Sequence, residues 1–103
     1  MENKYLLHGK FTAKPGQQKE LADILIQASQ LVSKGKGCQL YIVSYDKEDE
    51  ASVYVTEIWD SKNDHDDSLK AEGVRELIMK AMPILDGPPT KGQEPEILGG
   101  MMI

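Results

Sequence analysis

The chain has 103 residues, of which 40% are hydrophobic and 28% are charged, and its formal net charge is −5. This length is typical of one domain with one hydrophobic core, so we expect a single domain over residues 1–103. With 12 basic residues against 17 acidic ones, the surface would repel a nucleic-acid backbone. No segment approaches the run of about 20 apolar residues that a membrane-spanning helix needs. The composition therefore predicts neither a nucleic-acid partner nor a membrane partner.

The cysteine content and the N-terminus bear on the compartment. Cys38 is the single cysteine, so it cannot form an internal disulfide, and this indicates a reducing setting. The first residues lack the basic region and the long apolar stretch of a signal peptide. We therefore expect a cytoplasmic protein.

The first half of the chain alternates between strand and helix patterns. Residues 5–13 predict a strand, and an apolar stripe at helical spacing predicts a helix over residues 17–34, with Gly35 as its left-handed cap. Residues 38–46 and 52–59 predict two further strands. A short polar turn joins these two strands, so we expect them to be antiparallel.

The second half predicts two short helical segments and a last strand. Ser61 is suited to cap a helix that runs to about Lys70. We expect Gly73 to break this helical region, and a second segment follows over residues 74–82. Residues 96–103 predict a final strand, which completes the order β-α-β-β-α-β. That order is the split βαβ pattern of a ferredoxin-like α+β fold.

The central strands carry apolar residues on both faces. One sheet face must cover the helices, and on the other face apolar side chains would meet water, namely Leu40, Ile42, Tyr54 and Ile58. A second sheet packed on that face would cover them. The pattern therefore predicts a homodimer of face-to-face sheets, with His8 as a hydrogen-bonded residue of the interface.

Three short motifs resemble those of the antibiotic biosynthesis monooxygenase family. Residues 56–61, TEIWDS, resemble its Glu-x-Trp junction between a strand and a helix. Residues 14–16, KPG, look like its turn before the first helix, and Gly37-Cys38-x-x-Tyr41 looks like its entry to the second strand. The motifs come in family order with family-like spacing, and the resemblance covers nearly the whole chain.

The resemblance implies a dimeric α/β barrel in which each subunit has a pocket between its sheet and its helices. Family members include oxygenases that act on aromatic polyketides and quinols with no metal or flavin. We therefore expect a cofactor-independent monooxygenase of a quinol or polyphenolic aromatic, with O₂ as its second substrate. Members often have a histidine where this chain has Ser68. The alternative is therefore a non-catalytic, small-molecule-binding or stress-related dimeric module.

The candidate catalytic residues are Glu57 and His65. Glu57 would be a buried carboxylate with a perturbed pKa if its strand face is the inner one, and otherwise an edge carboxylate in solvent. His65 lies one helical turn before Ser68, on the same helix side, although a surface position in an acidic helix start is the more ordinary interpretation. Either residue could accept a proton from a phenol.

We expect a mostly apolar cavity between the sheet and the helical region 61–85. Trp59 is the first candidate for its wall, and packing in the core is the alternative. Leu77 and Met79 could also line it, although only one of the two need point inward. With Ser68, these residues form the predicted substrate-binding set.

Other site classes lack their motifs in this sequence. There is no cysteine and histidine spacing that fits zinc, no Gly-x-Gly-x-x-Gly or phosphate-binding loop, and no Gly-x-Ser-x-Gly nucleophile elbow. We therefore expect no metal, no bound cofactor and no nucleophilic hydrolysis.

Overall fold

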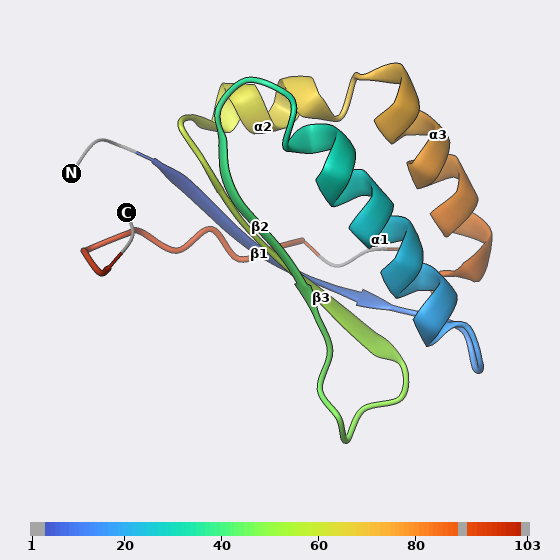
Figure 1. The fold of residues 1–103 in the computed structure, drawn as a ribbon. Coiled ribbons are helices and arrows are strands. Elements are labelled where there is room, and N and C mark those ends of the chain that lie inside the picture. Colours follow the sequence, from blue (N-terminus) through green and yellow to red (C-terminus); the bar gives the residue numbers. More distant parts are fainter. Residues whose placement is uncertain (1–3, 89–90, 102–103) are drawn as a thin grey trace.

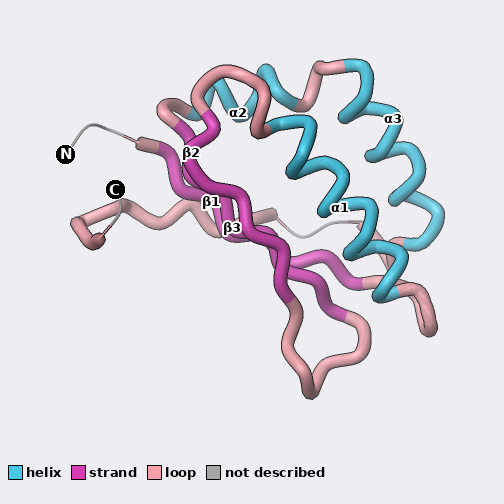
Figure 2. Tube along the Cα trace, in the orientation of Figure 1, coloured by secondary structure: helices cyan, strands magenta, loops and turns pink. Residues whose placement is uncertain are grey.

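The computed structural model of the chain describes residues 4–88 and 91–101. It has two layers, with the strands in one layer and all the helices on one side of it (Figures 1 and 2). The elements in chain order are β1 (Tyr5–Thr12), α1 (Gln18–Val32), β2 (Cys38–Ser44), β3 (Ser52–Trp59), α2 (Lys62–Ser68), α3 (Glu72–Ala81) and the 3₁₀-helix η1 (Met82–Ile84). This is the α+β, ferredoxin-like architecture that the sequence predicts.

The sheet is antiparallel with the strand order β1-β3-β2. The central strand β3 is the most buried, because it is flanked on both edges and covered by α1. Its register places Glu57 between Leu7 of β1 and Tyr41 of β2. Four residues before Glu57 in β3, Val53 pairs with Phe11. The side chains of these paired residues lie on the sheet face that meets the helices.

The prediction of a last strand over residues 96–103 is wrong for its described part. Residues 96–101 form no strand, and residues 102–103 lie outside the described residues. Residues before this segment pair with the edge strand instead. Gln93 forms an isolated bridge with His8 of β1, and Leu85 forms one with Ala13, the residue after β1. Pro95 has no N–H to donate, and glycines weaken a strand at positions 99–100, so the edge pairing does not continue.

Two glycine predictions are also corrected. Gly37, with φ +88°, takes the left-handed conformation between α1 and β2, and Gly35 does not. Gly73 lies inside α3, and the break between the two helices falls at residues 69–71. A Cβ at Gly73 would lie 3.1 Å from Leu31 Cδ1, so this glycine allows the start of α3 to approach the end of α1. It is a packing residue and not a helix breaker.

The hydrophobic core consists of two clusters. The larger one joins α1, β3 and the end of α3 around Leu21 and Val53, both of which are fully buried. The smaller one joins Val32, Trp59 and Val74 at the opposite end of the sheet. Residues of both clusters line one cavity.

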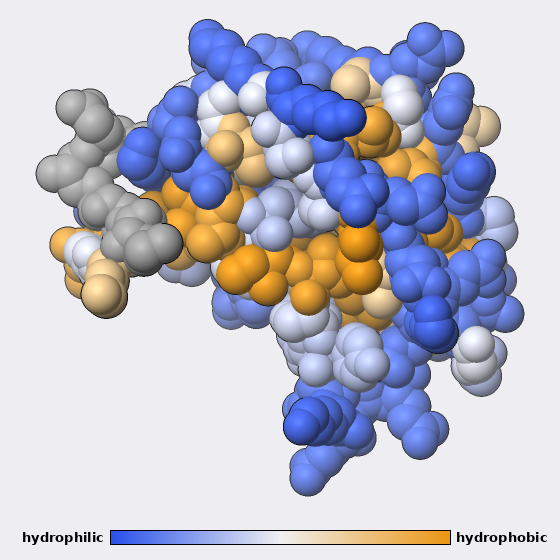
Figure 3. Space-filling model, viewed as in Figure 1, coloured by the Kyte–Doolittle hydropathy of each residue, from blue (hydrophilic) through white to orange (hydrophobic). Residues whose placement is uncertain are grey.

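The sheet face away from the helices is partly apolar. Ile42 is 49% exposed there, whereas Ile58, which lies between Leu6 and Leu40 in the register, is 8% exposed. His8 Nδ1 lies 2.9 Å from Thr56 Oγ1 on this face. In Figure 3 a band of apolar side chains crosses the molecule at the level of the strands. No helix in the described part of the chain is long and apolar enough to span a membrane.

Candidate functional site

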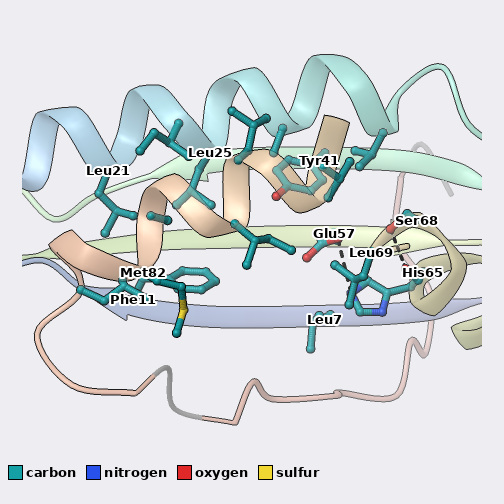
Figure 4. Close-up of a pocket in the computed structure, with 18 residues that line it drawn as sticks. Leu7, Phe11, Leu21, Leu25, Tyr41, Glu57, His65, Ser68, Leu69 and Met82 are labelled. Atoms are coloured by element: carbon teal, nitrogen blue, oxygen red, sulfur yellow. Dashed lines mark hydrogen bonds and ion pairs between the residues drawn. The ribbon is translucent and has the colours of Figure 1, made fainter. Parts of the chain in front are cut away.

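A cavity of about 290 Å³ lies between the sheet and the helices. Most of its wall is apolar, and its polar lining residues are Tyr41, Glu57, His65 and Ser68. Figure 4 shows Glu57, His65 and Ser68 gathered at one end and Leu21, Phe11 and Met82 at the other. The cavity predicted between the sheet and the region 61–85 is present, and its polar groups are concentrated at one end.

Glu57 enters this cavity from the central strand of the sheet, β3. Strand alternation turns its side chain toward the helices, together with Val53 and Val55, and the residue is only 8% exposed. Burial raises the pKa of the Glu57 carboxyl, because the charged form loses its hydration. The indole N–H of Trp59 donates a hydrogen bond of 3.0 Å to Glu57 Oε1, which partly offsets that rise. Glu57 is thus a buried carboxylate and not a solvent-exposed edge residue.

His65 reaches the same end of the cavity from α2. Ser61 caps this helix by accepting a hydrogen bond of 3.1 Å from the Asp64 N–H, as the sequence predicts. The His65 side chain is 12% exposed, and its Nε2 lies 3.9 Å from Glu57 Oε1. Its Nδ1 lies 3.0 Å from Asp66 Oδ1 on the solvent side. The expectation of a surface histidine is therefore wrong, because the capped helix turns this ring inward.

Two aromatic rings hold the imidazole of His65 in place. Trp59 meets it edge-on, with ring centroids 5.8 Å apart, and Tyr5 meets it at a tilt, with centroids 5.5 Å apart. The Tyr5 hydroxyl in turn donates a hydrogen bond of 2.7 Å to Glu94. The imidazole is therefore packed between the start of β1 and the end of β3, and the residues after η1 support that packing.

Trp59 does not line the cavity. It is fully buried and packs with Val32 and Val74, so the alternative interpretation of a core aromatic describes its place. Its indole still touches the site, because its N–H bonds to Glu57. The side chain therefore positions the carboxylate from behind.

The two candidate residues on α3, Leu77 and Met79, lie on different sides of the helix. Leu77 lines the cavity and is 7% exposed, on the stripe that also carries Val74 and Ala81. Met79 is 73% exposed and does not line it, because a position two residues from Leu77 falls on the opposite side of a helix. Ser68 lines the cavity, but its hydroxyl donates to the His65 carbonyl of its own helix.

Tyr41 is the polar residue of the cavity that was not among the site residues predicted from the sequence. It pairs directly with Glu57 across the strands and lines the same end of the cavity. Burial raises the pKa of its phenol well above the usual range, and the nearby Glu57 carboxylate adds to the rise. Alternation along the strand 38–46 already places Tyr41 and Val43 on one face, and that signal could have pointed to it.

The polar end of the cavity can bind a hydroxyl group and accept its proton. Glu57 and His65 supply the proton acceptors and Tyr41 supplies a hydroxyl, and most of the remaining wall is apolar. Among residues 4–88 and 91–101, no three side chains of His, Cys, Asp or Glu gather as a metal site would need. A ferredoxin-like domain with an acid and a histidine at the end of an apolar cavity defines a small-molecule-binding or catalytic α+β protein.

The family of this domain follows from comparison with known proteins. The model of the family described as antibiotic biosynthesis monooxygenase matches residues 4–79, and the chain belongs to this family. A structure described as a candidate antibiotic biosynthesis monooxygenase from Chloroflexus aurantiacus is 33% identical, with a TM-score of 0.83, and the match covers 94% of this chain and 95% of that one. The resemblance read from the three sequence motifs is thereby confirmed.

More distant structures share the fold. A protein from Pseudomonas aeruginosa is 20% identical with a TM-score of 0.83, and the match covers 96% of this chain and 98% of that one. Another candidate antibiotic biosynthesis monooxygenase, from Caulobacter crescentus, is 14% identical with a TM-score of 0.84 and coverages of 95% and 92%. No curated protein matches the chain.

Proposed function

We propose that this protein is a monooxygenase that oxidises a quinol or polyphenolic aromatic with O₂ and needs no bound cofactor. The observation that carries the proposal is the buried Glu57 carboxylate, 3.9 Å from the His65 imidazole at the polar end of an apolar cavity. An aromatic ring suits the apolar walls, and a phenolic hydroxyl suits the two proton acceptors. Membership of the monooxygenase family supports the same chemistry.

The reaction balances without an external reductant. A hydroquinone and O₂ give a hydroxyquinone and water, with one oxygen atom in the new hydroxyl group and the other in the water. The substrate supplies all the electrons, because it loses two hydrogens and gains one oxygen. Loss of a phenolic proton starts the sequence, because the phenolate passes an electron to O₂ more readily than the phenol does.

In this mechanism Glu57 and His65 remove the phenolic proton. The raised pKa of Glu57 makes it a stronger base than an ordinary carboxylate, which brings its proton affinity closer to that of the substrate. His65 can receive or share that proton, because its other ring nitrogen is held by Asp66. The apolar walls keep water from the phenolate, which keeps it reactive toward O₂.

Oxygen uptake over a panel of hydroquinones tests the proposal. We expect uptake faster than the uncatalysed autoxidation, and a loss on the order of 10²-fold in Glu57→Gln, as expected when a general base is removed. Glu48→Gln is the matched control, because Glu48 is an exposed carboxylate in the turn between β2 and β3. Equal rates for the two variants, or no uptake above autoxidation in the wild type, would contradict the proposal.

A binding module without catalysis is the second candidate. It is favoured by Ser68, which stands where family members often have a histidine and whose hydroxyl is bonded within α2. Tight binding of an aromatic ligand together with oxygen uptake at the autoxidation rate would identify this alternative.

We also propose that two copies of the chain associate through the sheet face that carries Ile42 and Tyr54. Ile42 is 49% exposed and Tyr54 is partly buried, and the family resemblance implies such a dimer. Light scattering after size exclusion should give roughly 23 kDa, twice the 11.5 kDa of the chain. Ile42→Asp should shift the protein toward the monomer, and a wild-type monomer at micromolar concentration would refute the dimer.

A further inference from the structure

The cavity is elongated along α1. Its lining includes Leu21 near the start of that helix and Val32 at its end. These residues are eleven positions apart, which is about 16 Å along a helix axis. On the sheet side, the cavity reaches from Leu7, beside Glu57, to Phe11, which is about 13 Å along a strand. A single aromatic ring at the polar end would leave most of this length unfilled.

The unfilled length is apolar. Beyond Glu57 and Tyr41 the wall is made of aliphatic and aromatic side chains from α1, β1, α3 and the residue after η1, which are Phe11, Leu21, Ile24, Leu25, Ala28, Leu77, Ala81 and Leu85. Several of them also form the larger core cluster, which closes this end. An apolar extension of the ligand would therefore bury itself against core side chains.

The mouth of the cavity is apolar as well. Leu69, Ile78 and Met82 line the cavity and are each between 41% and 56% exposed, so they form a rim that faces solvent. Exposed apolar side chains gathered at the rim of a cavity mark a ligand-binding surface. These three rim side chains carry no charge, so a hydrocarbon group meets apolar surface where it contacts them.

The charges at the polar end select the head group. Glu57 lies in the cavity, and Asp66 stands behind His65 at 3.0 Å. None of the described residues that line the cavity is a lysine or an arginine. A carboxylate or phosphate head would meet the Glu57 carboxylate and no lysine or arginine, so a neutral hydroxyl is the group that fits.

We propose that the ligand of this cavity is a neutral amphiphile, a phenol or quinol whose ring carries a narrow apolar tail. The hydroxylated ring lies between Tyr41, Glu57 and His65, and the tail runs along α1 toward Leu21. The aromatic head rests on the proposed function, whereas the tail and the lack of charge go beyond it.

Binding of 4-alkylphenols of increasing chain length tests the tail. Isothermal titration calorimetry under anaerobic conditions measures affinity without turnover. We expect the affinity to rise about fourfold with each added methylene, as for burial of a CH₂ group, until the tail reaches the closed end. An affinity that does not depend on chain length would overturn the proposal.

A variant that fills the closed end provides the matched comparison. Ala81→Leu adds volume at the end of the cavity, whereas Lys80→Leu adds the same side chain on the exposed side of α3. We expect Ala81→Leu to remove the gain from long tails and to leave the affinity for the shortest phenol unchanged, and Lys80→Leu to change neither. Equal chain-length profiles in both variants would refute the assigned path of the tail.

The head group is tested with wild-type protein alone. Alkanoates with the same tails should bind at least tenfold more weakly than the alkylphenols, and equal affinities would overturn the assignment of a neutral head. The result is separable from the proposed function. Binding that depends on chain length, without oxygen uptake, would support the amphiphile site and refute the oxygenase. Oxygen uptake with unsubstituted quinols, without any gain in affinity from the tails, would support the oxygenase and refute the amphiphile site.

Discussion

The hydrogen bond from Trp59 to Glu57 can be measured through the substitution Trp59→Phe. Phe keeps an aromatic ring in the fully buried site but removes the indole N–H that donates to Glu57 Oε1 at 3.0 Å. Part of the cost is lost packing, about 1–2 kcal/mol, which is less than the roughly 3–5 kcal/mol of truncating a buried aromatic to alanine. This part does not depend on pH.

The other part depends on the charge of Glu57. A hydrogen bond to a charged group contributes about 1.5–3 kcal/mol, and one between neutral groups about 0.5–1.5 kcal/mol. Because Glu57 is 8% exposed, little solvent screening reduces this difference. Trp59→Phe should therefore cost about 1 kcal/mol more at pH 8 than at pH 4, because a higher pH favours the charged form of Glu57. The same change corresponds to a further rise in the pKa of Glu57.

Urea unfolding followed by circular dichroism at fixed protein concentration measures both costs. The sign follows from the raised pKa of Glu57, since the wild type loses stability as the pH rises through that pKa and the variant should lose more. The double variant that combines Glu57→Gln with Trp59→Phe closes the double-mutant cycle. When Glu57→Gln is already present, the pH dependence of the Phe substitution should vanish. Equal costs of Trp59→Phe at pH 4 and pH 8 in the protein that keeps Glu57 would refute the reasoning.

Three further predictions concern the surroundings of the site. In an absorbance titration at 295 nm, Tyr5 and Tyr41 should ionise above the range of free tyrosine, because burial raises the pKa of both phenols. Ser61→Ala should lower the free energy of unfolding by about 1 kcal/mol through the lost cap, and a urea midpoint unchanged from wild type would contradict the capping role. Gly37→Ala should cost at least about 1–2 kcal/mol by the same assay, because φ there is +88° and a Cβ would collide with the Asp64 carboxylate.

Most of the fold could be predicted from the sequence because its patterns are local. Apolar spacing located α1 and the three strands within a few residues, and Ser61 was identified as a cap from its residue type and position. The prediction of a C-terminal strand was wrong because an apolar run forms a strand only where it can pair with the edge of a sheet. The chain reached the edge of β1 already at Gln93, before Pro95.

The site was less predictable, because it depends on which neighbours each side chain meets. Strand alternation put Glu57 and Trp59 on one face, but it could not show that Trp59 is covered by Val32 and Val74 while Glu57 opens to the cavity. The acidic surroundings of His65 indicated a surface residue, whereas the structure packs its ring against Tyr5 and Trp59. Residue type was informative, whereas burial had to come from the tertiary packing.

The position of Glu57 is hard to explain by stability alone. It lies two residues before the end of the central strand, between Leu7 and Tyr41, where an apolar side chain would pack without the cost of burying a carboxylate. The adjacent cavity also costs stability, because it separates two clusters that could otherwise form one continuous core. The buried carboxylate and the cavity therefore lower stability at the same place. The indole N–H of Trp59 and the ring of His65 reduce the cost of burying the carboxylate but not the cost of the cavity. A cavity that leaves a carboxylate open to a ligand-sized volume is what binding and proton transfer require, so both costs have one explanation in the proposed site.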